Sequence, residues 1–449
     1  MIIRNGAVAI SGAPRLIRTD IQVKGEKITA LGRDLPSDGE REIDASGLEI
    51  FPGGIDPHVH FFDPGFPDKE DFFHGTAAAA SGGITTVIDM PGTSDPPVIN
   101  KRNLEHKRSI VEPKAVVDFA FFGGVSAQAY REGFPHWMRE LAPLVPAFKT
   151  YATSGSTAFE RLNHYQYSRV LEVARELHRP ILVHAEDADF VLPATEDLRE
   201  KENTPAAFAA TRPELAETLA VFAVSEIAET LQAPLHIVHI GTARAAEIVA
   251  GRTTTTGETC PQYLAFDIDD FERIGSPLKI TPPVKGPEEK HLLWNYLADG
   301  GIDFVASDHA PGTRAEKNTG SIWTDYAGIP GGPTIYPYLY SAGLRSGRLT
   351  LARFLEVTSA AAARRYGLDD RKGRIEVGMD ADLTFVDPTA ATVVHGADSP
   401  SKGKITPFEG MRLHGRVQIT IVRGSVVYRE GKVLSAGGTG RFLAPRNGE

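Results

Sequence analysis

The sequence predicts an α/β protein: a (β/α)8 TIM-like barrel with a small β-sandwich domain built from both chain ends. With 449 residues, the chain has room for a barrel and a smaller satellite domain. In its middle part, short apolar runs alternate with helix-patterned stretches, which is the rhythm of parallel βα units. We therefore expect a barrel over residues 52–370 and a sandwich domain made of residues 1–51 and 371–449.

Short strand-like runs separated by glycine-rich breaks mark both chain ends. At the N-terminus they lie at residues 7–10, 20–23 and 27–30. Near the C-terminus they lie at residues 382–386, 416–422 and 425–428. The shared style of the two ends predicts that they fold together into one β-domain.

Eight apolar runs between these ends are the predicted barrel strands. They lie near residues 55–60, 84–90, 116–122, 145–151, 180–185, 235–240, 254–259 and 302–308. Helix-like segments, such as residues 215–231, lie between them. An open doubly wound sheet has a similar rhythm, but eight units favour a closed barrel.

Composition excludes several classes of function. Hydrophobic residues at 41% and charged residues at 24% are near globular averages, which predicts a buried core. The net charge of −10, without a cluster of Lys and Arg, argues against nucleic-acid binding. No apolar run reaches about 18 residues, so no membrane span is expected. The single cysteine, Cys260, is expected to be buried packing, and the lack of a signal-peptide pattern predicts a cytoplasmic protein.

Ligand-type side chains stand at the ends of several predicted strands. His58 and His60 are spaced i, i+2, so on a strand both point to the same side. His184, His239 and Asp308 follow three further apolar runs. The carboxyl ends of barrel strands share one face, where active sites lie. Imidazoles that converge there suit zinc or a similar metal ion.

One lysine, Lys149, lies inside the fourth apolar run. Burial lowers the pKa of a lysine by favouring the neutral amine. A neutral amine can add CO₂ and become a carbamate, an anion whose two oxygens can bridge two metal ions. His236, by contrast, is three positions before His239 on its strand and is expected to be a core residue.

These motifs resemble those of the cyclic amidohydrolase branch of the amidohydrolase superfamily, which includes dihydroorotase, allantoinase and dihydropyrimidinase (hydantoinase). The resemblance extends over nearly the whole chain. It is carried by the segments PGGIDPHVHFFDPG (52–65), AAAASGGITTVIDMP (77–91), FKTYATSG (148–155), LVHAED (182–187), HIVHIGT (236–242), GETCPQYL (257–264), SDHAP (307–311) and KGRIEVGMDADL (372–383).

The resemblance implies a hydrolase that opens the amide C–N bond of a small cyclic amide or ureide with a metal-bridging hydroxide. It implies two divalent ions, expected to be zinc, bridged by N6-carboxylated Lys149. The implied ligands of the pair are His58, His60, Lys149, His184, His239 and Asp308. Asp308 would also be the catalytic base and acid. Relatives are often dimers or tetramers, so a homo-oligomer is expected.

The ring that is opened is less sharply predicted. Dihydroorotases have Arg and Asn where this chain has Phe62 and Gly92, and both bind the substrate carboxylate. An unpaired carboxylate in a closed pocket is unfavourable by several kcal/mol. A hydantoin, dihydropyrimidine or allantoin type of ring is therefore expected, with an apolar wall at Phe62. Dihydroorotate is the alternative, if Arg314, Lys317 or Lys285 replaces those contacts.

No subfamily matches cleanly. Ser154 stands where dihydropyrimidinases have Tyr, and Phe62 stands where allantoinases have Asn. Tyr151, Ser154, Thr281 and Gly328 complete the predicted substrate site, together with Phe62 and Gly92. Two further alternatives stay open. One is a non-catalytic structural relative, which the full set of ligand positions disfavours, and the other is an acyclic amidase of the same superfamily.

Overall fold

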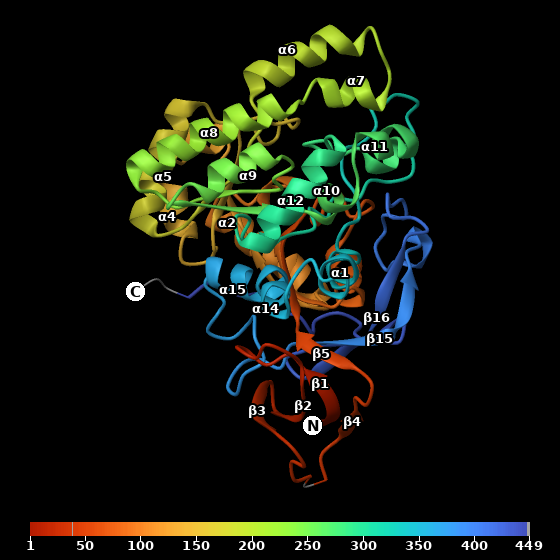
Figure 1. Cartoon of the computed structure of the whole chain (residues 1–449). Coiled ribbons are helices and arrows are strands. Elements are labelled where there is room, and N and C mark those ends of the chain that lie inside the picture. Colours follow the sequence, from red (N-terminus) through yellow and green to blue (C-terminus); the bar gives the residue numbers. More distant parts are fainter. Residues whose placement is uncertain (38, 447–449) are drawn as a thin grey trace.

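The computed structural model describes residues 1–37 and 39–446, in which a helix-covered barrel adjoins a β-domain (Figure 1). The barrel strands are β6 (Gly54–Val59), β7 (Ile84–Asp89), β8 (Asp118–Phe121), β9 (Gly123–Gly124), β10 (Phe148–Tyr151), β11 (Ile181–His184), β12 (Leu235–Ile237), β13 (Thr255–Thr259) and β14 (Phe304–Val305). Each of the eight predicted apolar runs contains one of these strands, and β9 directly continues β8 after a one-residue break.

Parallel pairing joins the barrel strands in the order of the chain. One sheet has the order β6-β7-β8, and the other runs from β9 through β10, β11, β12 and β13 to β14. A parallel bridge between Val59 and His309 connects the outer strands of the two sheets. Every residue of β6, β7 and β8 is buried, as expected for parallel strands covered on both faces. The predicted TIM-barrel architecture is confirmed.

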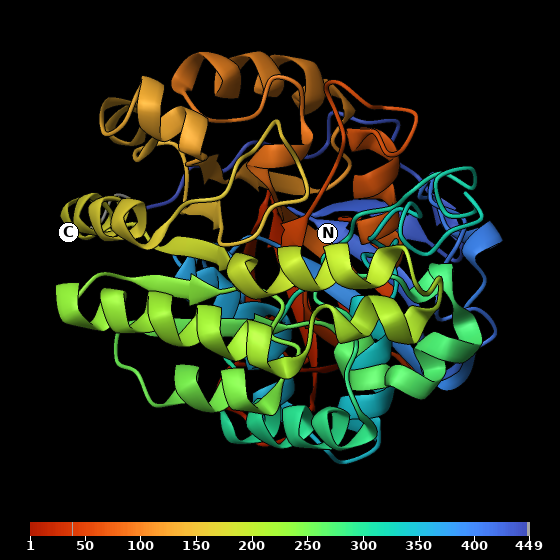
Figure 2. The same ribbon diagram turned by 90° about the horizontal axis from the view of Figure 1, so that it is seen from above.

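Helices cover the outside of the strands, as the view from above shows (Figure 2). They are α1 (Phe72–Ser81), α2 (Lys101–Val111), α3 (Ala127–Glu132), α4 (His136–Leu141), α5 (His164–Leu177), α6 (Ala188–Arg199), α7 (Pro205–Ala210), α8 (Glu214–Leu231), α9 (Ala243–Ala250), α10 (Pro261–Ala265), α11 (Ile268–Ile274), α12 (Pro287–Asp299), α13 (Ile335–Tyr338), α14 (Leu351–Leu355) and α15 (Ala361–Arg365). Short 3-10 turns lie at Pro91–Thr93, Glu112–Lys114, Ser276–Leu278 and Gly396–Asp398, and π-helical turns lie at Leu339–Arg345 and Glu356–Ala360.

Both chain ends contribute to one mixed sheet, as the sequence predicts. Its strands are β1 (Ile2–Val8), β2 (Ile17–Lys24), β3 (Lys27–Gly32), β4 (Glu42–Asp44), β5 (Glu49–Pro52), β15 (Leu383–Val393), β16 (Arg412–Val422), β17 (Ser425–Arg429) and β18 (Lys432–Val433). The order is β18-β17-β16-β15-β5-β1-β2-β3, with β4 beside β1, so the antiparallel pair of β15 and β5 joins the two ends. Apolar side chains from both ends share one core, which includes Ile3, Ile50, Leu383 and Ile421.

Buried charges fasten the β-domain to the barrel. The Lys372 ammonium lies 2.6 Å from Asp118 of β8 and 2.5 Å from Asp382, and Arg423 also pairs with Asp118. The lysine thus supplies the cation for this carboxylate cluster. The chain then returns to the barrel, where Phe442 bridges Phe119. The domain division at residues 51/52 and 370/371 stays a prediction, since the last described segment lies along a barrel strand.

Candidate metal centre and active site

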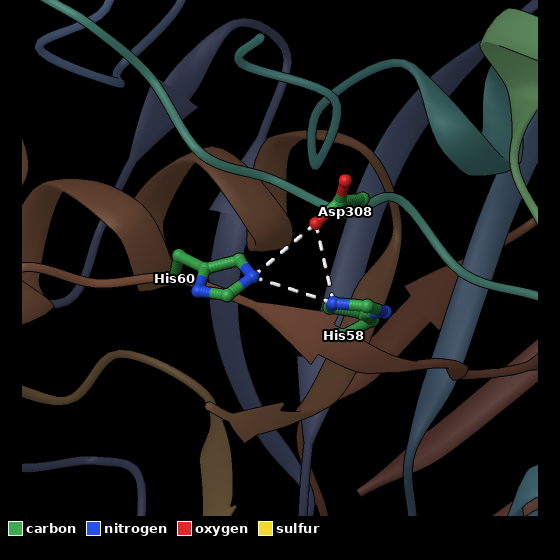
Figure 3. Close-up of side chains that lie close together, drawn as sticks. All are labelled: His58, His60 and Asp308. Carbon is green, nitrogen blue, oxygen red and sulfur yellow. Dashed lines mark hydrogen bonds and ion pairs between the residues drawn. The ribbon is translucent and has the colours of Figure 1, made fainter. Parts of the chain in front are cut away.

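Three of the predicted ligand residues meet at the carboxyl end of the barrel strands (Figure 3). His58 lies on β6 and His60 directly after it, and their Nε2 atoms are 3.3 Å apart. Asp308 follows β14, and its Oδ1 atom lies 3.2 Å from Nε2 of His58 and 3.3 Å from Nε2 of His60. Three electron-pair donors converge here on one point, which is the arrangement that a metal ion requires.

Two further predicted ligands lie on the neighbouring strands. His184 ends β11 and His239 follows β12, and Nδ1 of His184 is 3.0 Å from Nε2 of His239. The rings of His58 and His239 are 5.5 Å apart between centroids, so the two groups adjoin. His239 (φ 42°) and Asp308 (φ 50°) both have left-handed backbone, which is uncommon for residues other than glycine. Such strain persists where the surrounding structure imposes it, and it clusters at functional sites.

Lys149 lies on β10 between these groups and is almost fully buried. Burial lowers the pKa of Lys149 to about 8, and the charge of Asp308 partly opposes this shift. Its own charge contributes to the lowered pKa of His58, His184 and His239, which places it near all three imidazoles. A lysine in this environment gives up its proton far more readily than an exposed one.

The side chains fit a metal centre in their charge states. Burial lowers the pKa of His58 and His239 well below the usual range, so both rings are neutral, which is the form that binds metal. Burial alone would raise the pKa of Asp308, but His58 and His60 hold it well below its usual range. Nδ1 of His60 and Nδ1 of His239 are buried without a hydrogen-bond partner among the described residues.

Two buried glutamates that the sequence reasoning missed hold ligand imidazoles. Oε1 of Glu258 lies 2.5 Å from Nδ1 of His58, which leaves Nε2 free to face the centre. The other oxygen of Glu258 lies 3.2 Å from Nε2 of His236, a buried residue as expected. Glu186 lies 2.9 Å from Nε2 of His184. The signals were present, because Glu186 is two residues after His184 and Glu258 belongs to the GETCPQYL motif.

The predicted apolar wall at Phe62 is built as an aromatic corner. Phe62 is buried, and its ring packs edge-on against Tyr326 with centroids 6.3 Å apart. The ammonium of Lys69 lies 5.0 Å from the Phe62 centroid and 2.6 Å from a carboxylate oxygen of Glu316. The positive charge next to Phe62 is therefore already paired.

Gly92, Tyr151 and Ser154 lie around one aromatic ring, that of Phe159. A Cβ atom on Gly92 would come within 3.3 Å of this ring. The Tyr151 ring packs edge-on against Phe159 and lies 5.6 Å from the His184 ring between centroids. The Ser154 hydroxyl donates to the backbone oxygen of Phe159 over 2.7 Å, so it is engaged in holding its own loop.

The last two predicted substrate residues, Thr281 and Gly328, lie on adjacent loops. The Gly328 N–H donates to the backbone oxygen of Lys279, two residues before Thr281. Gly328 has φ 152°, and a Cβ atom there would lie 2.3 Å from the oxygen of Ala310. Only glycine fits this close approach, which brings its loop against the segment that follows Asp308.

Glu217 of α8 fastens the loop after His239, and its replacement by Gln is expected to stabilise the protein at alkaline pH. Oε1 of Glu217 accepts the Gly241 N–H over 2.8 Å. Burial raises the pKa of Glu217 from 4.5 to about 7, so the folded state favours its protonated form. The stability from this group is fully present below pH 4.5 and is lost as the pH rises through about 7.

The side-chain amide that Glu217→Gln introduces stays neutral at every pH and can still accept the same N–H. We expect the free energy of unfolding at pH 8 to rise by about 1–3 kcal/mol. Urea titrations at pH 8 and at pH 4.5 measure the effect, with exposed Glu226→Gln on the same helix as the matched control. A loss of stability at pH 8, or an equal gain at both pH values, contradicts this account.

The sequence profile of the Amidohydrolase family matches residues 50–427. The chain belongs to the amidohydrolase family. Over 99% of its length it is 36% identical to an allantoinase of Rubrobacter xylanophilus, 98% of which is covered. An allantoinase of Enterococcus faecalis is 33% identical, with 99% of each chain covered.

Solved structures agree with this membership. The L-hydantoinase (dihydropyrimidinase) of Arthrobacter aurescens has a TM-score of 0.93 with this amidohydrolase, at 29% identity over 99% of both chains. The dihydropyrimidinase of Brevibacillus agri has a TM-score of 0.91 at 30% identity, over 99% of this chain and 98% of that one.

These relatives confirm the predicted family and the predicted enzyme class, a metal-dependent hydrolase acting on C–N bonds of cyclic amides. They do not favour the dihydroorotase or the non-catalytic alternative. No helix in the described part of this amidohydrolase is long and apolar enough to cross a membrane.

Proposed function

We propose that this amidohydrolase opens the ring of a small neutral cyclic ureide of the allantoin, hydantoin or dihydropyrimidine type. The observation that carries the proposal is the convergence of the predicted ligands at one end of the barrel, with an uncharged aromatic corner beside them. The names of its relatives, allantoinase and hydantoinase, support the same class of substrate.

Six side chains are proposed to hold two divalent ions, with zinc as the expected metal. His58, His60 and Asp308 would bind one ion, and His184 and His239 the other. Lys149, as its N6-carboxylated form, would bridge the two. When bound, such a pair supplies a hydroxide nucleophile near neutral pH and polarises the ring carbonyl. Neutral imidazoles and the lowered pKa of Lys149 support these assignments.

Asp308 is proposed to move the proton of the reaction. Its carboxylate is held ionised beside His58 and His60, so it can accept a proton from the nucleophile. The same oxygen can then deliver that proton to the leaving ring nitrogen. The loops of Thr281 and Gly328 are proposed to bind the ring amide through backbone groups, because Gly328 admits a close approach of the backbone.

The candidate replacements for a carboxylate-binding Arg are engaged elsewhere. The Lys317 ammonium donates to the backbone oxygens of Ser276 (2.9 Å) and Lys279 (3.3 Å). The Lys285 ammonium donates to the backbone oxygen of Arg212. Both lysines already have partners that a substrate carboxylate would have to displace. This supports a neutral ring over dihydroorotate.

A substrate panel tests the proposed function. We expect purified, zinc-loaded enzyme to hydrolyse allantoin, hydantoin or dihydrouracil with a kcat/KM at least about 10²-fold above that for dihydroorotate, since an unpaired carboxylate disfavours binding by several kcal/mol. In Phe62→Arg, the preference should shift toward dihydroorotate because the new guanidinium can pair with its carboxylate. Robust activity of the wild-type enzyme on dihydroorotate alone would refute the proposal.

A homo-oligomer is proposed on the basis of an apolar stripe on α8. Leu215, Leu219 and Phe222 have the helical spacing i, i+4, i+7 and are each 44–52% exposed. A two-fold axis would pack this stripe against its own copy. Light scattering on the wild type should give a multiple of the chain mass of 48.6 kDa, and Phe222→Glu should reduce it. A monomeric wild type would contradict the proposal.

A further inference from the structure

Glu186 is buried between a proposed metal ligand and a basic side chain. One of its oxygens, Oε2, lies 2.9 Å from Nε2 of His184, and the same oxygen pairs with the Arg212 guanidinium. Its side chain is 1% exposed. A carboxylate without charged partners would be strongly disfavoured at this depth, so the pairing with Arg212 is what makes it tenable there.

The contact with Glu186 determines which nitrogen of His184 faces the centre. A carboxylate at Nε2 holds the proton on that nitrogen and leaves a lone pair on Nδ1. Nδ1 is the atom that lies 3.0 Å from Nε2 of His239. The ring orientation and its tautomer are thus both directed toward a shared ligand with His239.

Glu186 is itself held from several directions. Arg212 lies between α7 and α8, and its backbone oxygen accepts from the Lys285 ammonium. The Thr153 hydroxyl donates to the backbone oxygen of Glu186. The next residue, Asp187, donates its N–H to the oxygen of Ala216, over 2.9 Å. The start of α8 therefore anchors the segment that follows β11.

The two halves of the centre have separate carboxylates. Glu258 holds His58 through Nδ1, whereas Glu186 holds His184 through Nε2. We propose that Glu186, oriented by Arg212, is the positioning residue that gives the His184 and His239 half of the centre its affinity for metal. This inference rests on the proposed metal-dependent function, and it predicts that the two halves can be weakened independently.

Metal content tests the inference directly. Wild type, Glu186→Gln and Arg212→Lys are equilibrated with buffered free zinc, and bound zinc per chain is measured by mass spectrometry. Exposed Glu226→Gln is the matched control for the loss of a carboxylate. Ring-opening activity is measured in parallel at low and at raised free zinc, with kcat and KM determined separately.

We expect the wild type and Glu226→Gln to bind two ions per chain. Glu186→Gln should keep one ion with unchanged affinity and bind the other about 10- to 100-fold more weakly. Raised zinc should restore most of its kcat, with KM little changed. Arg212→Lys keeps the positive charge but loses the guanidinium geometry, so it should show a smaller loss.

Two results would overturn the inference. One is wild-type affinity for both ions in Glu186→Gln, and the other is an equal weakening of both ions. If Glu186→Gln does not give a cooperative unfolding transition, Arg212→Lys decides by the same criteria. If the wild type itself binds no zinc pair, the proposed function fails, and this outcome is distinct from a wild type that binds two ions while the variants do too.

Discussion

Replacing Asp308 by Asn is expected to reduce kcat/KM for ring opening by about 10²- to 10⁴-fold, the range of general acid–base catalysis. The amide of Asn keeps one oxygen where the carboxylate oxygen faces His58 and His60, but it cannot accept the proton. The variant should fold, because residue 308 has left-handed backbone (φ 50°), which Asn adopts more readily than most residues.

Steady-state kinetics on the preferred ring measures this loss, and circular dichroism checks the fold. Asp299→Asn, an exposed position at the end of α12, is the matched control and should keep full activity. Zinc bound at the His184 and His239 half should be retained. Activity of Asp308→Asn within a few-fold of the wild type would exclude Asp308 as the proton acceptor.

Replacing Lys149 by Ala is expected to abolish measurable activity. The substitution removes the proposed bridge between the two ions, and a loss of about 4 kcal/mol or more of catalytic stabilisation corresponds to about 10³-fold or more in rate. It also removes a buried amine from among His58, His184 and His239, so the fold itself should not be weakened by an unpaired charge.

Carboxylation can be followed apart from activity. Wild-type enzyme prepared with zinc and isotope-labelled bicarbonate should show one carbamate carbon by NMR, and Lys149→Ala should show none. Lys101→Ala, an exposed lysine at the start of α2, serves as the control and should retain the signal. A carbamate signal that persists in Lys149→Ala would place the modification elsewhere.

Much of the fold could be predicted from the sequence because burial leaves a direct pattern. Strands covered on both faces become continuous apolar runs, which is why β6, β7 and β8 were recognisable. The i, i+2 spacing of His58 and His60 likewise follows from strand geometry. The ends of two strands were less accurate, since β12 stops at Ile237 and β14 at Val305, before the apolar runs end. There the chain turns out of the sheet toward the left-handed residues His239 and Asp308.

The sequence by itself determined the barrel, the joining of both chain ends, the family and the candidate ligands, because each depends on local periodicity or on contiguous motifs. Only the tertiary structure decided which carboxylate holds which imidazole. His58 and Glu258 are 200 positions apart, and Arg212 reaches Glu186 from the connection between α7 and α8. No local pattern encodes such pairs, because the distance between two distant residues is set by the packing of all the elements between them.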